Sequence, residues 1–239
     1  MKRMLAALAI AAVPAAATAA DWSVEAGTAI VDVPDRPGAR SRHWLVLPAW
    51  SATYGSRLQI NIDDGARWTA LDRGALKLGP IIEYRTSYDH RPPAGFPKIR
   101  DAIEPGIFAQ LTTPVAAVEG RVRKAVDGYN GWSGDLAVDT ELSVRTPGTI
   151  GIEARAAWAD RAFGKSRFGV ATANGLRPFS GRDYLSIGLG AQWRLPLNSC
   201  IAVVANVGAD RLLTNGSSPL VQTRWLIETG IGLSYRFGQ

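Results

Sequence analysis

The sequence predicts an all-β fold: a transmembrane antiparallel up-and-down β-barrel. Three observations support this prediction. The chain begins with an export signal, it contains a series of segments in which apolar and polar residues alternate, and the connections between these segments alternate between long and short. The 239 residues suit a single all-β domain.

The first twenty residues have the layout of a secretory signal peptide. Lys2 and Arg3 precede a short apolar run, which ends in the small residues 17–20. No later apolar run approaches the roughly 20 residues that a transmembrane helix needs. We therefore expect residues 1–20 to be removed on export and residues 21–239 to form the barrel.

The amino-terminal half contains five expected strands, each ended by a turn signal. They are 22–31 before the polar loop 32–41, 42–53 before the turn 54–56, 57–63 before Asp64-Gly65, 67–71 before the turn 72–75, and 77–88 before the proline-rich loop 89–101. The pattern is clear in 57–63, where Leu58 and Ile60 alternate with Gln59 and Asn61. It is weakest in 67–71, and omitting that strand with a neighbour gives ten strands instead of twelve.

The carboxy-terminal half contains seven more expected strands. They are 102–112 before the turn 112–115, 116–125 before the glycine-rich loop 126–134, 135–145 before the turn 146–148, 149–159 before the irregular stretch 160–182, 183–195 before the turn 196–199, 200–212 before the loop 214–222, and finally 223–237. In the last of these, Ile231 and Leu233 alternate with Gly232 and Ser234.

The lengths of the connections depend on their order along the chain. Odd-numbered connections are mostly long and polar, whereas even-numbered connections are short turns. Bacterial outer-membrane barrels have an even number of strands, short periplasmic turns and long outer loops. The sequence therefore predicts an outer-membrane barrel with both termini in the periplasm.

Charged residues recur on one face of many of the expected strands. Because a charge on the lipid face near the membrane centre costs roughly 2–4 kcal/mol, these residues are expected in the lumen and the apolar face in lipid. The expected lumen charges are Glu83, Arg85, Glu119, Arg121, Arg123, Asp139, Glu141, Glu153, Arg155, Glu228 and Arg236. They have two interpretations: an ion-selective channel lining, or cross-strand ion pairs that fill the barrel.

The sequence resembles the MipA/OmpV family of outer-membrane proteins, which includes the MltA-interacting proteins. The similar segments are "LGPIIEYR" (78–85), "DGYNGWSGDL" (127–136), "AAWADRAFGKSRFGVAT" (156–172), "GSSPLV" (216–221) and "GIGLSYRF" (230–237). The sequence departs from the family where Asp127-Gly128-Tyr129 lacks a histidine, and where Gly238 and Gln239 follow the terminal aromatic residue.

The resemblance implies an outer-membrane location and, for part of the family, a scaffold role between a murein hydrolase and a murein synthase. Other members are porin-like or adhesive. Barrels of this kind end on an aromatic residue that is read during membrane insertion, so Tyr235 and Phe237 are the expected carboxy-terminal insertion signal.

Composition argues against several other functions. His43 and His90 are the only histidines, Cys200 is the only cysteine, and no Gly-x-Ser-x-Gly motif occurs. We therefore expect no catalytic residues, no metal site and no cofactor. The net charge of +6 falls when Lys2 and Arg3 are removed, and no basic cluster is interleaved with aromatic residues, so we expect no nucleic-acid partner.

Two connections remain candidates for contacts. The basic stretch 160–182 either faces lipopolysaccharide phosphates or folds back into the mouth of the barrel, and Tyr129 and Trp132 in the glycine-rich loop are a candidate exposed contact site. The leading functional prediction is a non-enzymatic scaffold in contact with outer-membrane lipid. The alternative is a small channel for polar solutes, followed by an outer-membrane hydrolase.

Overall fold

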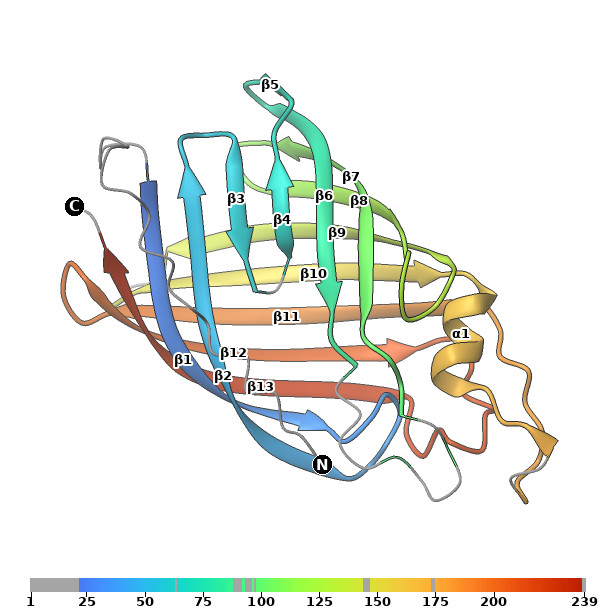
Figure 1. The fold of residues 1–239 in the computed structure, drawn as a ribbon. Helices are drawn as coiled ribbons and strands as arrows, with labels where there is room; N and C mark the ends of the chain where they lie inside the picture. Colours follow the sequence, from blue (N-terminus) through green and yellow to red (C-terminus); the bar gives the residue numbers. More distant parts are fainter. Residues whose placement is uncertain are drawn as a thin grey trace, which may run out of the picture.

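The computed structural model describes residues 22–62, 64–87, 92, 96, 98–143, 147–172 and 175–237. The expected signal peptide and Gly238-Gln239 lie outside these residues. The backbone forms one antiparallel sheet that curves round into a barrel (Figure 1). Its strands are β1 (Trp22–Pro34), β2 (Arg42–Tyr54), β3 (Leu58–Asn61), β4 (Gly65–Trp68), β5 (Leu71–Arg73), β6 (Leu76–Arg85), β7 (Ala102–Thr112), β8 (Ala117–Lys124), β9 (Trp132–Ser143), β10 (Thr149–Ala159), β11 (Tyr184–Pro196), β12 (Ile201–Leu212) and β13 (Trp225–Phe237).

Each strand pairs with its neighbours in the chain except β4 and β5, which do not pair with each other, and two further pairings complete the barrel. The first strand, β1, pairs with the last, β13, and β4 pairs with β6. Twelve strands form the closed wall, whereas β5 pairs only with β6 as a short hairpin. The prediction of a transmembrane β-barrel with twelve strands is confirmed.

The expected fourth strand, 67–71, is divided in the structure into β4 and β5. The division has a hydrogen-bonding cause. The backbone N–H of Thr69 donates to the carbonyl of Arg57 beside β3, whereas the N–H of the next residue, Ala70, donates to Leu78 in β6. The chain thus changes its partner strand at Thr69, and one continuous strand across 67–71 was the wrong prediction.

The seam between β4 and β6 requires a glycine. Only Ala66 and Arg67 of β4 have register partners in β6. Gly65 has a φ of +73°, and a Cβ atom on it would lie 2.0 Å from the backbone oxygen of Ile82. A side chain at Gly65 would therefore conflict both with the local conformation and with closure of the barrel.

The outer surface is apolar, as the alternation predicts. Large hydrophobic side chains such as Trp44, Val46, Ile107 and Leu189 are about two-thirds exposed, and they come from strands all around the barrel. Such a surface is suited to lipid, and the closed sheet provides hydrogen-bonding partners for the backbone there. Within the described part of the chain, no helix has both the length and the apolar character needed to span a membrane.

The short turns lie at one end of the barrel and the long connections at the other (Figure 1). Both chain ends of the sheet belong to the short-turn end, because Val24 near the start of β1 pairs with Phe237 at the end of β13. The expected alternation of long and short connections therefore corresponds to the two ends of the barrel.

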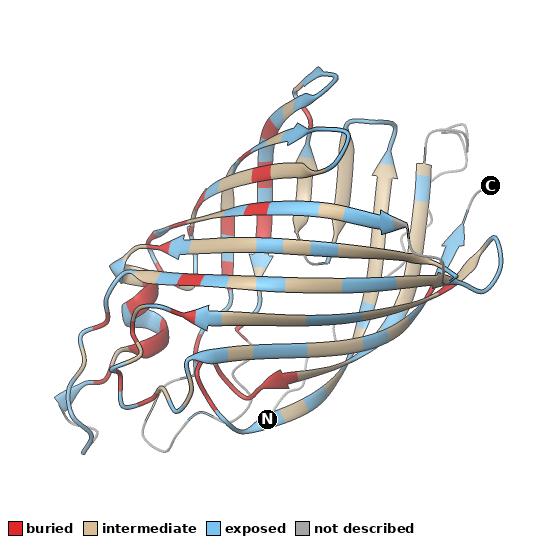
Figure 2. Cartoon of the chain, turned by 180° about the vertical axis from the view of Figure 1, so that it is seen from behind, coloured by how far each residue is buried: buried red, intermediate tan, exposed pale blue. Residues whose placement is uncertain are grey.

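One helix, α1 (Arg161–Phe168), lies at the long-loop end, where the sequence predicted an irregular stretch. Asp160 caps it by accepting hydrogen bonds from the backbone N–H groups of Ala162 and Phe163. Phe163 and Phe168 are buried against the barrel end, and buried residues gather around this helix (Figure 2). Burial of these rings explains a helix that is too short to be stable alone.

Candidate functional site

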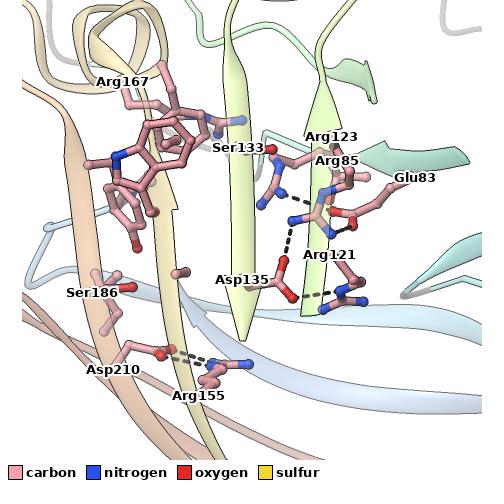
Figure 3. Close-up of a pocket in the computed structure, with 18 of the residues that line it drawn as sticks. Glu83, Arg85, Arg121, Arg123, Ser133, Asp135, Arg155, Arg167, Ser186 and Asp210 are labelled. Atoms are coloured by element: carbon pink, nitrogen blue, oxygen red, sulfur yellow. Dashed lines mark hydrogen bonds and ion pairs between the residues drawn. The ribbon is translucent and has the colours of Figure 1, made fainter. Parts of the chain in front are cut away.

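A cavity of about 660 Å³ lies inside the barrel next to α1 (Figure 3). Strands β1, β6 and β8 to β13 contribute side chains to its lining, and so does α1. Seven of the eleven expected lumen charges line it: Glu83, Arg85, Arg121, Arg123, Glu153, Arg155 and Glu228.

Arg123 on β8 is the most buried arginine of the lumen, with a side chain only 3% exposed. Its guanidinium lies 2.6 Å from the Glu83 carboxylate on β6, and it also pairs with Asp135 on β9. A third carboxylate, that of Glu104 on β7, lies 3.4 Å away. One arginine thus connects four successive strands through their inward side chains; Figure 3 shows its contacts with Glu83 and Asp135.

Glu104 is completely buried, and its carboxylate accepts hydrogen bonds from three side chains. Arg85 donates to it at 2.7 Å, and the hydroxyls of Tyr129 and Ser133 each donate at 2.8 Å. Burial, together with this neighbouring carboxylate, raises the pKa of the Tyr129 hydroxyl to about 12. The expectation that Tyr129 is an exposed contact residue is wrong, because the ring turns inward to Glu104; Trp132 is about half exposed.

Other ion pairs join strands that are not neighbours in the sheet. Arg121 on β8 lies 2.6 Å from Asp64 in the turn between β3 and β4, and Arg67 on β4 lies 2.8 Å from Glu119 on β8. Two further pairs have the same character: Arg155 on β10 with Asp210 on β12, and Arg194 on β11 with Glu25 on β1. Each of these contacts spans two to four strands along the inner face of the wall, so together they narrow the lumen and hold non-neighbouring strands to one another.

Four of the expected lumen charges lie at the margins of this network. Glu153 is 3.4 Å from Arg155, and Arg236 is 3.5 Å from Glu25. Asp139 and Glu141 are exposed residues of β9, and neither forms an ion pair with any residue that the structure describes. These two carboxylates are therefore outside the network.

Seven participants were not among the expected lumen residues: Glu25, Asp64, Arg67, Glu104, Asp135, Arg194 and Asp210. For most of them, the alternation of residues along the strand indicates that the side chain faces inward. Glu104, for example, shares its strand face with Ala102 and Gly106, and Asp135 shares its face with Asp139. Asp64 lies in a turn, where alternation gives no information.

The two histidines and the acidic residues offer no metal centre in the described residues, where no three His, Cys, Asp or Glu side chains are grouped around a common point. The Nδ1 atom of His43 lies 2.8 Å from the Asp35 carboxylate; Asp35 is buried and His43 is partly buried. His90 lies outside the described residues.

A comparison with protein families gives one match. The family described as "MltA-interacting protein MipA" matches residues 26–237, which is nearly all of the barrel. No curated protein sequence matches the chain significantly.

Solved structures with a similar fold include outer-membrane proteins of low sequence identity. A loop-deletion mutant of OmpT from Vibrio cholerae is 8% identical, with a TM-score of 0.42, over 91% of this chain and 98% of that one. OprG from Pseudomonas aeruginosa is 12% identical, with a TM-score of 0.29, over 92% and 96% of the two chains.

Proposed function

Because this chain belongs to the MltA-interacting protein (MipA) family, we propose that it is a non-enzymatic scaffold of the outer membrane that binds murein-processing partners. The apolar outer surface and the closed wall support a membrane location, and closed barrels of this kind are typical of outer membranes. In this proposal the short turns and both termini face the periplasm, and the long loops face outward.

The observation that carries the proposal is the pairing across the lumen. A channel lining is expected to present a continuous polar path, with charges available to passing solutes. Here Arg121, Arg123 and Arg155 each bind a carboxylate from a different strand, so their charges are neutralised locally. The network stabilises the wall and narrows the interior beside the cavity, which suits a barrel whose function resides in its surfaces.

The proposed binding surface consists of three short turns: 72–75, 112–115 and 196–199. They lie at the same end of the barrel, where a periplasmic murein hydrolase or synthase could reach them all (Figure 1). The name of the family refers to an interaction with MltA, which supports a partner of this class.

The partner can be tested by co-purification with a murein hydrolase. We expect a barrel in which the three turns are replaced by Gly-Ser segments to fold but to lose the hydrolase. The matched control replaces the exposed residues 175–178 at the opposite end, and this variant should retain the partner. Equal retention by both variants would contradict the proposed surface.

The exposed basic residues of the long-loop end support a second contact. Arg161, Lys165 and Arg177 are exposed, whereas Arg167 in the same stretch is buried. We propose that the exposed three contact lipopolysaccharide phosphates, for which arginine and lysine are suited. In this proposal, both alternatives for residues 160–182 apply: the three exposed residues contact lipopolysaccharide, and α1 folds back over the mouth of the barrel.

The cavity supports one alternative function, a small channel for polar solutes. It measures about 660 Å³ and is lined by charged side chains. Conduction requires a continuous wet path through the network, so conductance measurements separate the alternatives.

A further inference from the structure

Arg167 on α1 is a buried cation that the ion-pair network does not use. Its side chain is among the lining residues of the cavity, although the residue is only 5% exposed. The Nε and Nη2 atoms are buried and form no hydrogen bond, and no carboxylate in the described parts of the chain forms an ion pair with the guanidinium. Figure 3 shows Arg167 at the α1 side of the cavity, apart from the paired groups of Arg123 and Asp135.

The nearby well-buried carboxylates form no ion pair with this guanidinium, because each of them binds another arginine. Glu83 binds Arg123, Glu104 binds Arg85, and Asp210 binds Arg155. Burial, and then the nearby positive charge of Arg85, lowers the pKa of Arg167 to about 10. The guanidinium remains charged at neutral pH, so it is a cation in a partly dehydrated space without an ion-pair partner among the described residues.

The surroundings of Arg167 are aromatic. Its guanidinium carbon lies 5.0 Å from the centre of the Phe163 ring, and Phe163 makes an edge contact with Tyr184 at 5.1 Å. Phe168 is stacked on Tyr184, and all three rings line the cavity. The ring face attracts the cation but does not replace an anion, since such contacts are weaker than charge-assisted hydrogen bonds.

We propose that the cavity is a binding site for a small organic anion, whose carboxylate or phosphate group pairs with Arg167 and whose apolar body lies against Phe163, Phe168 and Tyr184. An oxyanion would supply the hydrogen-bond acceptors that the Nε and Nη2 atoms lack. The cavity of about 660 Å³ lies within the usual range for small-molecule sites. This site is independent of the scaffold role, because it lies at the opposite end from the short turns.

The test measures ligand binding to the purified full-length barrel in detergent by calorimetry and by thermal unfolding. The probes are benzoate, phenyl phosphate, inorganic phosphate and the neutral benzamide. We expect benzoate or phenyl phosphate to bind and to raise the unfolding temperature, and benzamide to do neither. Comparison of phenyl phosphate with inorganic phosphate tests whether the apolar body contributes.

The variant Arg167→Met removes the charge and keeps an apolar side chain of similar length. We expect it to bind the anions about tenfold more weakly or worse, as for the loss of charge-assisted hydrogen bonds. Its ligand-free form should unfold at a higher temperature than wild type, because an unpaired buried charge has been removed; a purely structural Arg167 would give the opposite shift. Arg161→Met, an exposed position on the same helix, is the matched control and should bind like wild type.

Three results would overturn the proposal. The first is benzamide binding as tightly as benzoate to wild type, which requires no variant to fold. The second is unchanged anion affinity in Arg167→Met. The third is an equal loss of affinity in Arg161→Met, which would assign the effect to the general charge of the helix.

Discussion

The guanidinium of Arg121 lies 2.6 Å from the carboxylate of Asp64, and this pair connects β8 with the turn between β3 and β4. The two residues are 57 positions apart in the sequence. The hairpin of β3 and β4 is the shortest part of the closed wall, because β3 pairs with β2 only along Ser51–Tyr54. The ion pair therefore holds the least extensively paired segment of the barrel to β8, a few strands further along the inner wall.

Breaking this pair should weaken the barrel. Asp64→Asn keeps the size of the side chain but leaves Arg121 without one of its carboxylates. The side chains of Arg121 and Asp64 are 20% and 41% exposed, so we expect a loss of about 1–3 kcal/mol, between the values for surface and buried pairs. The measurement is the temperature at which the folded, faster-migrating gel band disappears. Arg100→Gln, which breaks the exposed pair with Asp127, should leave that temperature unchanged.

Closure of the barrel should depend on Gly65. Gly65→Ala places a Cβ atom 2.0 Å from the backbone oxygen of Ile82, and we expect it to reduce the folded fraction in lipid vesicles. Gly74 is the matched control: its φ of +65° is similar, but nothing lies within 4 Å of an added Cβ. Gly74→Ala should fold nearly as well as wild type. If the two variants fold equally, close contact at the seam is not what requires Gly65.

The assignment of faces can be tested with two neighbouring residues of β11. Leu189 is 65% exposed on the outer surface, whereas Gly190 faces the lumen opposite Glu153. Leu189→Arg should reduce the free energy of folding into bilayers by roughly 2–4 kcal/mol, because the charge lies in lipid. Gly190→Arg should be tolerated better, since an added Cβ makes only ordinary contacts there. The reverse order in a folding titration would show that the faces are exchanged.

Orientation in the membrane can be measured by cysteine labelling on intact cells, in a background where Cys200 is replaced by Ser. Arg177→Cys lies at the long-loop end and should react with an impermeant thiol reagent. Pro147→Cys lies at the short-turn end and should react only after the outer membrane is opened. Both positions are exposed in the structure, so a difference reports the compartment. Surface labelling of Pro147→Cys alone would invert the proposed topology.

Much of the wall was predictable from sequence because the outer face of a membrane barrel must be apolar along the whole strand. This requirement produces the period of two that identified β6, β10 and β13 within a few residues. The break at Thr69 was not predictable, because it depends on a change of hydrogen-bonding partner between β3 and β6. The helix α1 was missed for a similar reason: a helix of eight residues is stable only through its burial.

The sequence indicates which charged residues face the lumen, but it does not indicate which of them form ion pairs. Alternation places Arg123 and Arg155 inside, but it does not identify their partners. Arg194 and Glu25, for instance, are 169 positions apart in the sequence and meet only because the barrel closes. The buried cation at Arg167, which has no carboxylate partner among the described residues, was hidden for the same reason, since the sequence shows a basic stretch without showing which member turns inward.

The central claim is that ion pairs across the lumen neutralise its charges and close the path through the barrel. Conductance of the purified, refolded protein in planar bilayers tests this claim most directly. The account predicts no stable unitary currents for the wild type, at either polarity. Stable, ion-selective unitary currents in the wild type would contradict it and would establish the channel function instead.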